Sequence, residues 1–285
     1  MTTLGKAPHR HRRTTLPQTD RSRAFGALLA KSVTDRLTLA GIVGLLMIAM
    51  GAFVGALYPP LRETFAALPS DFADAIGKAF PGGDLTSGIG WANAELMSIV
   101  APVGAIAVAV ISAARATAGE EEDKTLGVLL AAPVGRLTFL FTKAAAMVIH
   151  VLIVGICLAV GIVAGNFIGD LGITANGIVG ATAHTVVLGI LFGIIAILIG
   201  AATGKRRLAA AATGGLAALA FAISTFLPLS DSLAGGAKLS PWYYFNASNP
   251  LAHGPDAGHL IILAIATMIP IAFAAAIFHR RDLRG

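Results

Sequence analysis

The sequence contains few charged residues and only one cysteine. Charged residues make up 13% of its 285 residues, against about 25% in an ordinary soluble domain. A chain with so few charges cannot cover a globular surface with polar groups, so lipid must cover most of it. The single cysteine, Cys157, excludes an intrachain disulfide and a cysteine-based metal site.

Long apolar runs stand where charges are missing. Six runs each have about the 20 residues that cross the hydrocarbon core of a bilayer, and none of them contains Lys, Arg, Asp or Glu. They cover residues 37–58, 96–114, 144–165, 181–204, 208–227 and 259–278. The sequence therefore predicts an all-α polytopic protein with six transmembrane helices, located in the cell (inner or plasma) membrane.

Positive charges are distributed unevenly between the connecting segments. Of the 21 Lys and Arg residues, 18 lie on one side of the six runs, and only Arg62, Lys78 and Lys238 lie on the other. The positive-inside rule then places both termini in the cytoplasm. The same charges attract anionic membrane lipids. Nucleic-acid binding is not indicated, because no basic stripe alternates with aromatic residues.

The segment before the first apolar run divides into two parts. Residues 1–20 are polar and basic, which predicts a disordered arm; residues 21–285 form the transmembrane domain. From residue 21 to 36, apolar and basic residues recur on different faces of a helix, which predicts an amphipathic helix in the inner interface. Its main positions are Arg21, Phe25, Leu28 and Leu29. The alternative is a cytoplasmic extension of the first transmembrane helix.

Two long segments are expected on the outer side, residues 59–95 and 228–258. The second contains Trp242, Tyr243 and Tyr244. Its aromatic residues either lie at the outer membrane interface or belong to a partly re-entrant cap over a translocation path, where irregular backbone would need protein cover. The sequence leaves these two interpretations open.

Small residues and prolines within the runs indicate how the helices pack. Glycines four residues apart allow close contact between helices. Such pairs are Gly51 and Gly55, Gly161 and Gly165, Gly189 and Gly193, and Gly200 and Gly204. Pro102 and Pro270 each lack a backbone donor, so the second and sixth helices are expected to bend there.

The runs contain no set of residues suited to catalysis. Only His150 and His184 lie well inside them, about 9 Å from the inner surface and about 4–5 Å from the outer surface at the rise of an α-helix. They cannot meet across a core of about 30 Å, so each is expected to be neutral and bonded to a nearby carbonyl. With no Ser/His/Asp set and no metal-ligand spacing, we expect neither an enzyme nor a metal site.

A phosphate-binding loop is also missing. That motif needs Gly-Lys followed by Ser or Thr, which together hold phosphates and Mg²⁺. Gly-Lys occurs three times, followed by Ala7, Ala79 and Arg206. If ATP drives this protein, another subunit must bind the ATP and Mg²⁺.

One cytoplasmic loop combines an acidic cluster with an apolar face. The acidic residues Glu120, Glu121, Glu122 and Asp123 are followed by Leu126, Leu129 and Leu130 at helical spacing, and then by Pro133. In isolation such a cluster is most simply a solvated loop. Its place on an otherwise basic side favours a short helix that docks into a groove on a soluble partner, with carboxylates at the favourable end of the helix dipole.

Two motifs resemble the permease subunits of type-2 ABC exporters. The first comprises Gly119-Glu120-Glu121, Thr125-Leu126, Leu129-Leu130, Pro133, Arg136 and Lys143, and the second comprises Pro250-Leu251 and then Phe278-His279-Arg280-Arg281-Asp282-Leu283. Lys124 departs from the pattern, since a glycine commonly stands there. The substrate-contacting positions have no transferable motif.

This resemblance implies an export permease that works as half of a transporter. A second permease, identical or different, would pair with it, with the second and fifth helices at the interface. A separate ATP-binding cassette ATPase would dock on the loop between the second and third helices, aided by the helix at 21–36. The resemblance assigns this coupling to Glu120, Glu121, Glu122, Asp123, Leu126, Leu129, Leu130 and Pro133.

Two other classes of protein, a membrane enzyme and an ion-coupled carrier, are alternatives to this interpretation. A membrane enzyme acting on lipid-linked substrates could use the acidic cluster as a catalytic or metal site, but acidic partners elsewhere on the inner face are missing. An ion-coupled carrier usually keeps a carboxylate near the middle of the membrane. The six uncharged runs disfavour that class.

Overall fold

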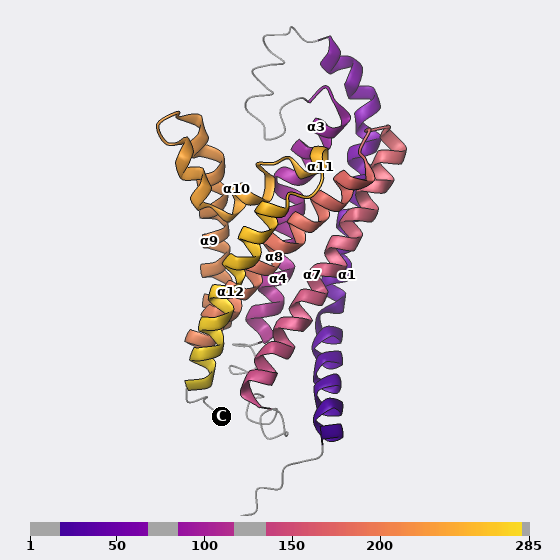
Figure 1. Ribbon diagram of the computed structural model, residues 1–285. Helices are drawn as coiled ribbons and strands as arrows, with labels where there is room; N and C mark the ends of the chain where they lie inside the picture. Colours follow the sequence, from indigo (N-terminus) through magenta and orange to yellow (C-terminus); the bar gives the residue numbers. More distant parts are fainter. Residues whose placement is uncertain (1–17, 68–84, 117–134, 281–285) are drawn as a thin grey trace, which may run out of the picture.

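The computed structural model describes residues 18–67, 85–116 and 135–280. The six predicted membrane crossings are confirmed, because six helices in these residues are long and apolar enough to span a bilayer. The described residues contain no strand, and the six crossings pack as one bundle (Figure 1). The crossings are α1 (Gln18–Ala66), the continuous run of α3 (Gly88–Ala92), η1 (Asn93–Val100) and α4 (Ala101–Ala114), then α7 (Arg136–Gly169), α8 (Ala175–Thr203), α9 (Arg206–Phe226) and α12 (Ala257–Arg280).

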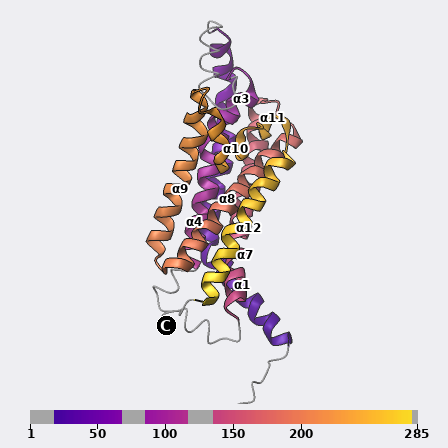
Figure 2. The same cartoon turned by 60° about the vertical axis from the view of Figure 1, so that its left-hand side comes forward.

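The bundle has one basic end and one acidic end. α1 begins and α12 ends at the same end of the bundle (Figures 1 and 2), which is the end that carries most of the described cations, among them Arg36, Arg115, Arg136, Arg206 and Arg280. We call it the basic end. The opposite, acidic end has the described carboxylates Glu63, Glu95, Asp170, Asp231 and Asp256 and the described cations Arg62 and Lys238.

The helices extend further than the apolar runs that predict them. α1 continues through Pro59 and Pro60 to Ala66, and the connection expected at 166–180 is reduced to residues 170–174. The second crossing begins at Gly88, not at residue 96. A run that stops at its first charged or turn-forming residue measures only the lipid-facing core, whereas the helix itself continues into the polar interface.

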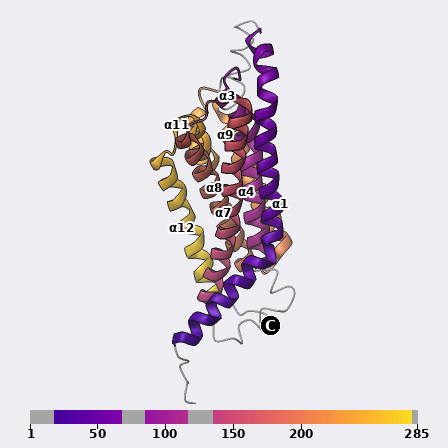
Figure 3. The same ribbon diagram turned by 90° about the vertical axis from the view of Figure 1, so that its right-hand side faces the viewer.

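The helix predicted at 21–36 is the first part of α1. It is continuous with the first crossing, which corresponds to the alternative interpretation, and α1 changes direction in its basic-end part (Figure 3). The hydroxyls of Ser32 and Thr34 donate to the carbonyls four residues earlier, at 2.7 and 2.9 Å, and such bonds bend helices. Phe25 is exposed, whereas Leu28 and Leu29 are half-buried. The position of this segment in the membrane interface stays a prediction.

α1 and α7 are held together by glycines whose backbones touch. A Cβ atom added to Gly51 or Gly55 would fall on the backbone of Gly161 or Gly165, and one added to Gly169 would meet Gly55. Two of the four glycine pairs predicted from the sequence, Gly51 and Gly55 with Gly161 and Gly165, therefore form one seam between these two helices. Close backbone approach of this kind is how small residues stabilise helix pairs in lipid.

The centre of the bundle is α8. It is the most buried of the six crossings, and α9 and α12 are the least buried. α8 packs on α4, α7, α9 and α12, and its Gly193 fits against Met147 and Ala109 from two of these helices. α8 ends at Gly204, whose positive φ of 64° suits a residue without a side chain. The outward faces of α9 and α12 are left to lipid or to another protein.

Helical hydrogen bonding in the second crossing is disturbed before Pro102. The segment Asn93–Val100 is a π-helix, and it ends immediately before the turn that contains Pro102. Pro102 has no N–H to donate to the carbonyl four residues earlier, which belongs to this π segment. The predicted bends at Pro102 and Pro270 stay predictions. The preceding helix α3 is anchored on α1, because the indole N–H of Trp91 donates to the carbonyl of Val54 at 2.9 Å.

Candidate functional site

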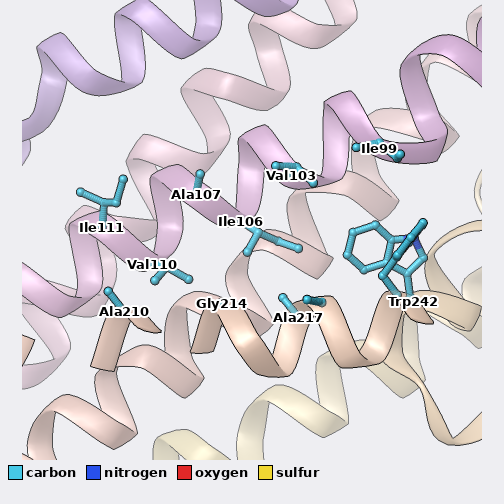
Figure 4. Close-up of a pocket in the computed structure, with 12 residues that line it drawn as sticks. Ile99, Val103, Ile106, Ala107, Val110, Ile111, Ala210, Gly214, Ala217 and Trp242 are labelled. Carbon is cyan, nitrogen blue, oxygen red and sulfur yellow. The ribbon is translucent and has the colours of Figure 1, made fainter. Parts of the chain in front are cut away.

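An apolar groove runs between the second and fifth crossings. Its volume is about 430 Å³, and no charged side chain lines it (Figure 4). The lining residues are Ile99, Val103, Ile106, Ala107, Val110 and Ile111 from η1 and α4; Ala210, Gly214, Ala217, Ala218 and Phe221 from α9; and Trp242 from the short helix α10 (Pro241–Asn246). A volume of this size falls in the range of about 300–1,000 Å³ that is typical of ligand pockets.

The groove exists because α9 has small residues where it faces α4. A Cβ atom added to Gly214 or Gly215 would meet nothing within 4 Å, so α9 leaves open space there. The neighbouring stripe of α9, with Ala209 and Thr213, is buried in the bundle. Leu219, at 56% exposure, belongs to the uncovered face. The groove thus adjoins a larger apolar surface that the described residues leave uncovered.

Short helices lie between α9 and α12 at the acidic end, and one of them lines the groove with Trp242. They are η3 (Leu227–Leu229), η4 (Ala234–Leu239), α10 and α11 (Pro250–His253). Ser240 caps α10, and its hydroxyl donates to the Ala220 carbonyl of α9 at 2.6 Å. Trp242 packs edge-to-face on Phe221 with ring centroids 5.2 Å apart. Trp242 and Phe245 are buried in protein, so the cap interpretation describes them better than an aromatic belt facing lipid.

His184 ties this cap to the centre of the bundle. Its Nδ1 lies 3.1 Å from the carbonyl oxygens of Tyr244 and Phe245. The backbone N–H of Asp256 donates to its Nε2 at 3.2 Å. This pattern assigns the single proton of a neutral imidazole to Nδ1. The predicted bonding of His184 to carbonyls is confirmed, and its ring joins α8, α10 and the start of α12.

Asp256 caps α12 beside this histidine. The backbone N–H of His259 donates to its carboxylate at 3.0 Å, and this bond lowers the pKa of Asp256 below the ordinary value of a carboxyl. Because the pKa is lowered in the folded state, the stabilisation is present above the ordinary carboxyl pKa and is lost as pH falls through the lowered value.

His150 also joins two helices through a backbone carbonyl, near the basic end. Its Nε2 lies 2.9 Å from the carbonyl oxygen of Val33, which lies between Ser32 and Thr34, the two residues whose hydroxyls bond back along α1. The predicted bond to a carbonyl is again confirmed. It connects α7 to the part of α1 where the helix changes direction, so these two helices are coupled at this point.

Two distant parts of the resemblance motifs meet at the basic end. Phe278 of α12 stacks on Phe139 of α7, with ring centroids 6.1 Å apart and an interplanar angle of 8°. The Lys143 ammonium lies 5.3 Å from the centroid of the same Phe139 ring. All three side chains are buried, and a cation over an aromatic face is favourable where water is excluded. Lys143 and Phe278 thus share one contact, through a residue that neither motif contains.

A sequence profile of ABC-2 family transporter proteins matches residues 28–283, almost the whole chain. The chain belongs to the ABC-2 family of transporter proteins. This membership, with its six apolar helices, makes the chain a multi-pass membrane permease of an ABC transporter. Such permeases work with an ATP-binding subunit. No curated protein sequence gave a significant match.

The coupling residues predicted in this ABC-2 protein lie outside the described residues. They are Glu120, Glu121, Glu122, Asp123, Leu126, Leu129, Leu130 and Pro133. The helices that flank them are described: α4 ends at Ala114, and α7 begins at Arg136. Segment 117–134 therefore connects the helix that lines the groove to the helix that forms the glycine seam.

The sequence-based prediction for one residue of this ABC-2 protein, Glu95, is wrong. Glu95 was expected to end an outer loop, but it lies inside the second crossing, in the π segment, with an exposed side chain. The apolar residues before it, such as Trp91 and Ala92, continue the helix and were the available signal. Among residues 18–67, 85–116 and 135–280, no group of three His, Cys, Asp or Glu side chains could hold a metal ion.

Proposed function

We propose that this ABC-2 permease is an exporter subunit that pairs with a second permease, identical or different, to enclose the substrate pathway. The groove between α4 and α9 is the observation that supports this proposal best. It is apolar, it has the volume of a ligand pocket, and it opens on a face that the chain leaves uncovered. Pairing of two such faces would enclose a path across the membrane.

The energy for transport comes from a separate ATP-binding cassette ATPase that binds ATP and Mg²⁺. This ATPase docks on segment 117–134, through the acidic cluster and the leucine face that follows it. α4 is continuous with this segment on one side and lines the groove with Val103 and Val110. A push on the segment therefore acts directly on one wall of the groove.

The segment is also connected to the rest of the basic end. α7, on its other side, packs along the glycine seam of α1 and touches α12 through Phe139 and Phe278. His150 joins α7 to the first part of α1, which contains Arg21, Phe25, Leu28 and Leu29. We assign to that part of α1 a second contact with the ATPase. The basic end then faces the cytoplasm, as the positive-inside rule requires.

Charge reversal at the acidic cluster tests the docking role. Glu121→Lys combined with Glu122→Lys is expected to lower co-purification of the partner ATPase by about tenfold or more, because each reversal replaces attraction by repulsion across the interface. Membrane insertion should be unchanged, since both residues lie outside the six crossings. The measurement is a pull-down of the ATPase with the tagged permease from detergent-solubilised membranes.

The matched control reverses a charge at the opposite end. Glu63→Lys changes an exposed carboxylate of α1 at the acidic end and should leave co-purification intact. Equal recovery of the ATPase with the wild-type and the doubly reversed permease would exclude docking through the acidic cluster.

A further inference from the structure

Glu95 is a carboxylate on an otherwise apolar stripe of the second crossing. The exposed positions of this helix recur every four residues, at Glu95, Ile99, Val103 and Ile111, with half-buried Ala107 between them. The four apolar members line the groove. Glu95 lies four residues before Ile99, about one turn beyond the acidic end of the groove lining. It is thus an exposed charged group on the same helix face as the groove lining, one turn away from it.

The described residues around Glu95 form no ion pair with it. Among residues 18–67, 85–116 and 135–280, no Lys or Arg forms a salt bridge with it. Glu95 immediately precedes the uncharged run 96–114, at the place where the second crossing continues into the polar interface. Glu95 also belongs to a π-helical segment, and such segments occur frequently at functional sites.

The groove beyond Glu95 accepts only apolar groups. Its walls are aliphatic along α4 and small along α9, and at the Ile99 end the rings of Trp242 and Phe221 line it (Figure 4). Aromatic faces attract cations in addition to apolar groups. A ligand that satisfies every part of this site has an apolar body for the trough and a positive charge at its acidic end.

We propose that this site binds cationic amphiphiles, with Glu95 pairing the positive group and the α4–α9 groove holding the apolar body. The proposal rests on the proposed function in one respect, since it takes the groove as part of the substrate pathway. It adds the class of substrate, which the groove alone leaves open between lipids, peptides and drugs.

The distribution of charge along the chain agrees with a positively charged ligand. The segments predicted on the outer side contain eight of the 15 carboxylates and three of the 21 Lys and Arg residues. Their carboxylates are Glu63, Asp71, Asp74, Asp84, Glu95, Asp170, Asp231 and Asp256. A surface of one sign concentrates ions of the other sign near it, so the acidic end favours cations over anions.

Binding to the full-length permease in phosphatidylcholine nanodiscs tests this assignment without the ATPase. The probes are radiolabelled tetraphenylphosphonium and the uncharged triphenylphosphine oxide, each corrected for binding to empty nanodiscs. Glu95→Gln is expected to weaken phosphonium binding about tenfold, from the loss of one partly screened ion pair, and to leave binding of the neutral probe unchanged. Glu63→Gln, which removes another exposed carboxylate at the same end, should change neither.

A groove-filling variant separates the charge from the trough. Gly214→Leu adds a side chain where open space exists and should weaken both probes about tenfold, with unfolding in detergent like that of the wild type. If Gly214→Leu weakens phosphonium binding but Glu95→Gln does not, the assignment of a cationic ligand is overturned and the pathway proposal stands. If the wild type does not bind tetraphenylphosphonium, or if Gly214→Leu leaves its affinity unchanged, the site itself would be overturned.

Discussion

Alanine at Gly55 is expected to destabilise the permease by about 3 kcal/mol, the upper part of the range for overpacking a tight interior. The new methyl group would fall on the Gly165 backbone of α7, and backbone cannot rotate away as a side chain can. α1 must therefore move off α7, which also opens the contacts of Gly51 and Gly161 along the same seam. The free energy of unfolding is measured by titration with SDS from mild-detergent micelles.

The control for Gly55→Ala is the same substitution elsewhere in α1. A Cβ atom at Gly41 would meet nothing within 4 Å, so Gly41→Ala should leave the unfolding free energy unchanged or slightly raised, since alanine is the better helix former. If both alanine variants unfold at the same SDS fraction, close backbone contact does not hold α1 to α7.

Removal of the His184 ring is expected to have a comparable effect at a different contact, the one between α8 and the cap. His184→Ala leaves the Asp256 N–H without its acceptor and the carbonyls of Tyr244 and Phe245 without the ring N–H. Each buried polar group left unsatisfied costs about 1–3 kcal/mol, so the loss should be about 3 kcal/mol. The cap should loosen with it, which hydrogen exchange of the backbone around α10 would detect.

His253→Ala is the matched control for this variant. His253 lies in the same cap and also bonds a carbonyl, that of Ser248 at 3.1 Å, but its side chain is exposed. Water replaces that bond, so the stability and exchange rates should stay close to those of the wild type. Equal effects of the two variants would mean that the central position of His184 is unimportant.

The number and direction of the crossings follow from the sequence because lipid imposes a simple rule. A helix in the membrane must be apolar over a fixed length, and six runs without charges satisfy that rule. The histidine bonds were predictable for a similar reason, since a buried imidazole needs a partner and carbonyls are the nearest acceptors. The distribution of Lys and Arg likewise predicts that both chain termini lie on the same side, and α1 begins and α12 ends at the same end of the bundle (Figure 1).

The pairing of particular helices was not predictable from the same reasoning. Glycines four apart occur in several crossings, and only the structure shows that Gly51 and Gly55 meet Gly161 and Gly165. Spacing gives the face of one helix but not its register against another. The contact between Phe139 and Phe278 was missed for the same reason, because it joins helices far apart in the chain.

Glu95 shows where an argument from charge misleads. An uncharged run ends by definition at the first carboxylate, so a functional carboxylate inside a crossing is assigned to a loop. The structure places it in the π segment of the second crossing. The resemblance alone predicts that the second and fifth crossings line a dimer interface, and that interface stays a prediction.

The central claim is that force from a separate ATPase enters this permease through segment 117–134 and moves the walls of the groove. The most direct measurement follows a single cysteine in the groove, Ala218→Cys with Cys157→Ser, reconstituted with the partner ATPase in vesicles. The rate of labelling by a membrane-impermeant maleimide is compared with and without a non-hydrolysable ATP analogue. We predict a change of about tenfold, the scale of a 1.4 kcal/mol shift between two states, that disappears with Glu121→Lys and Glu122→Lys. A nucleotide effect of the same size with the reversed loop, or with no ATPase present, would contradict the account.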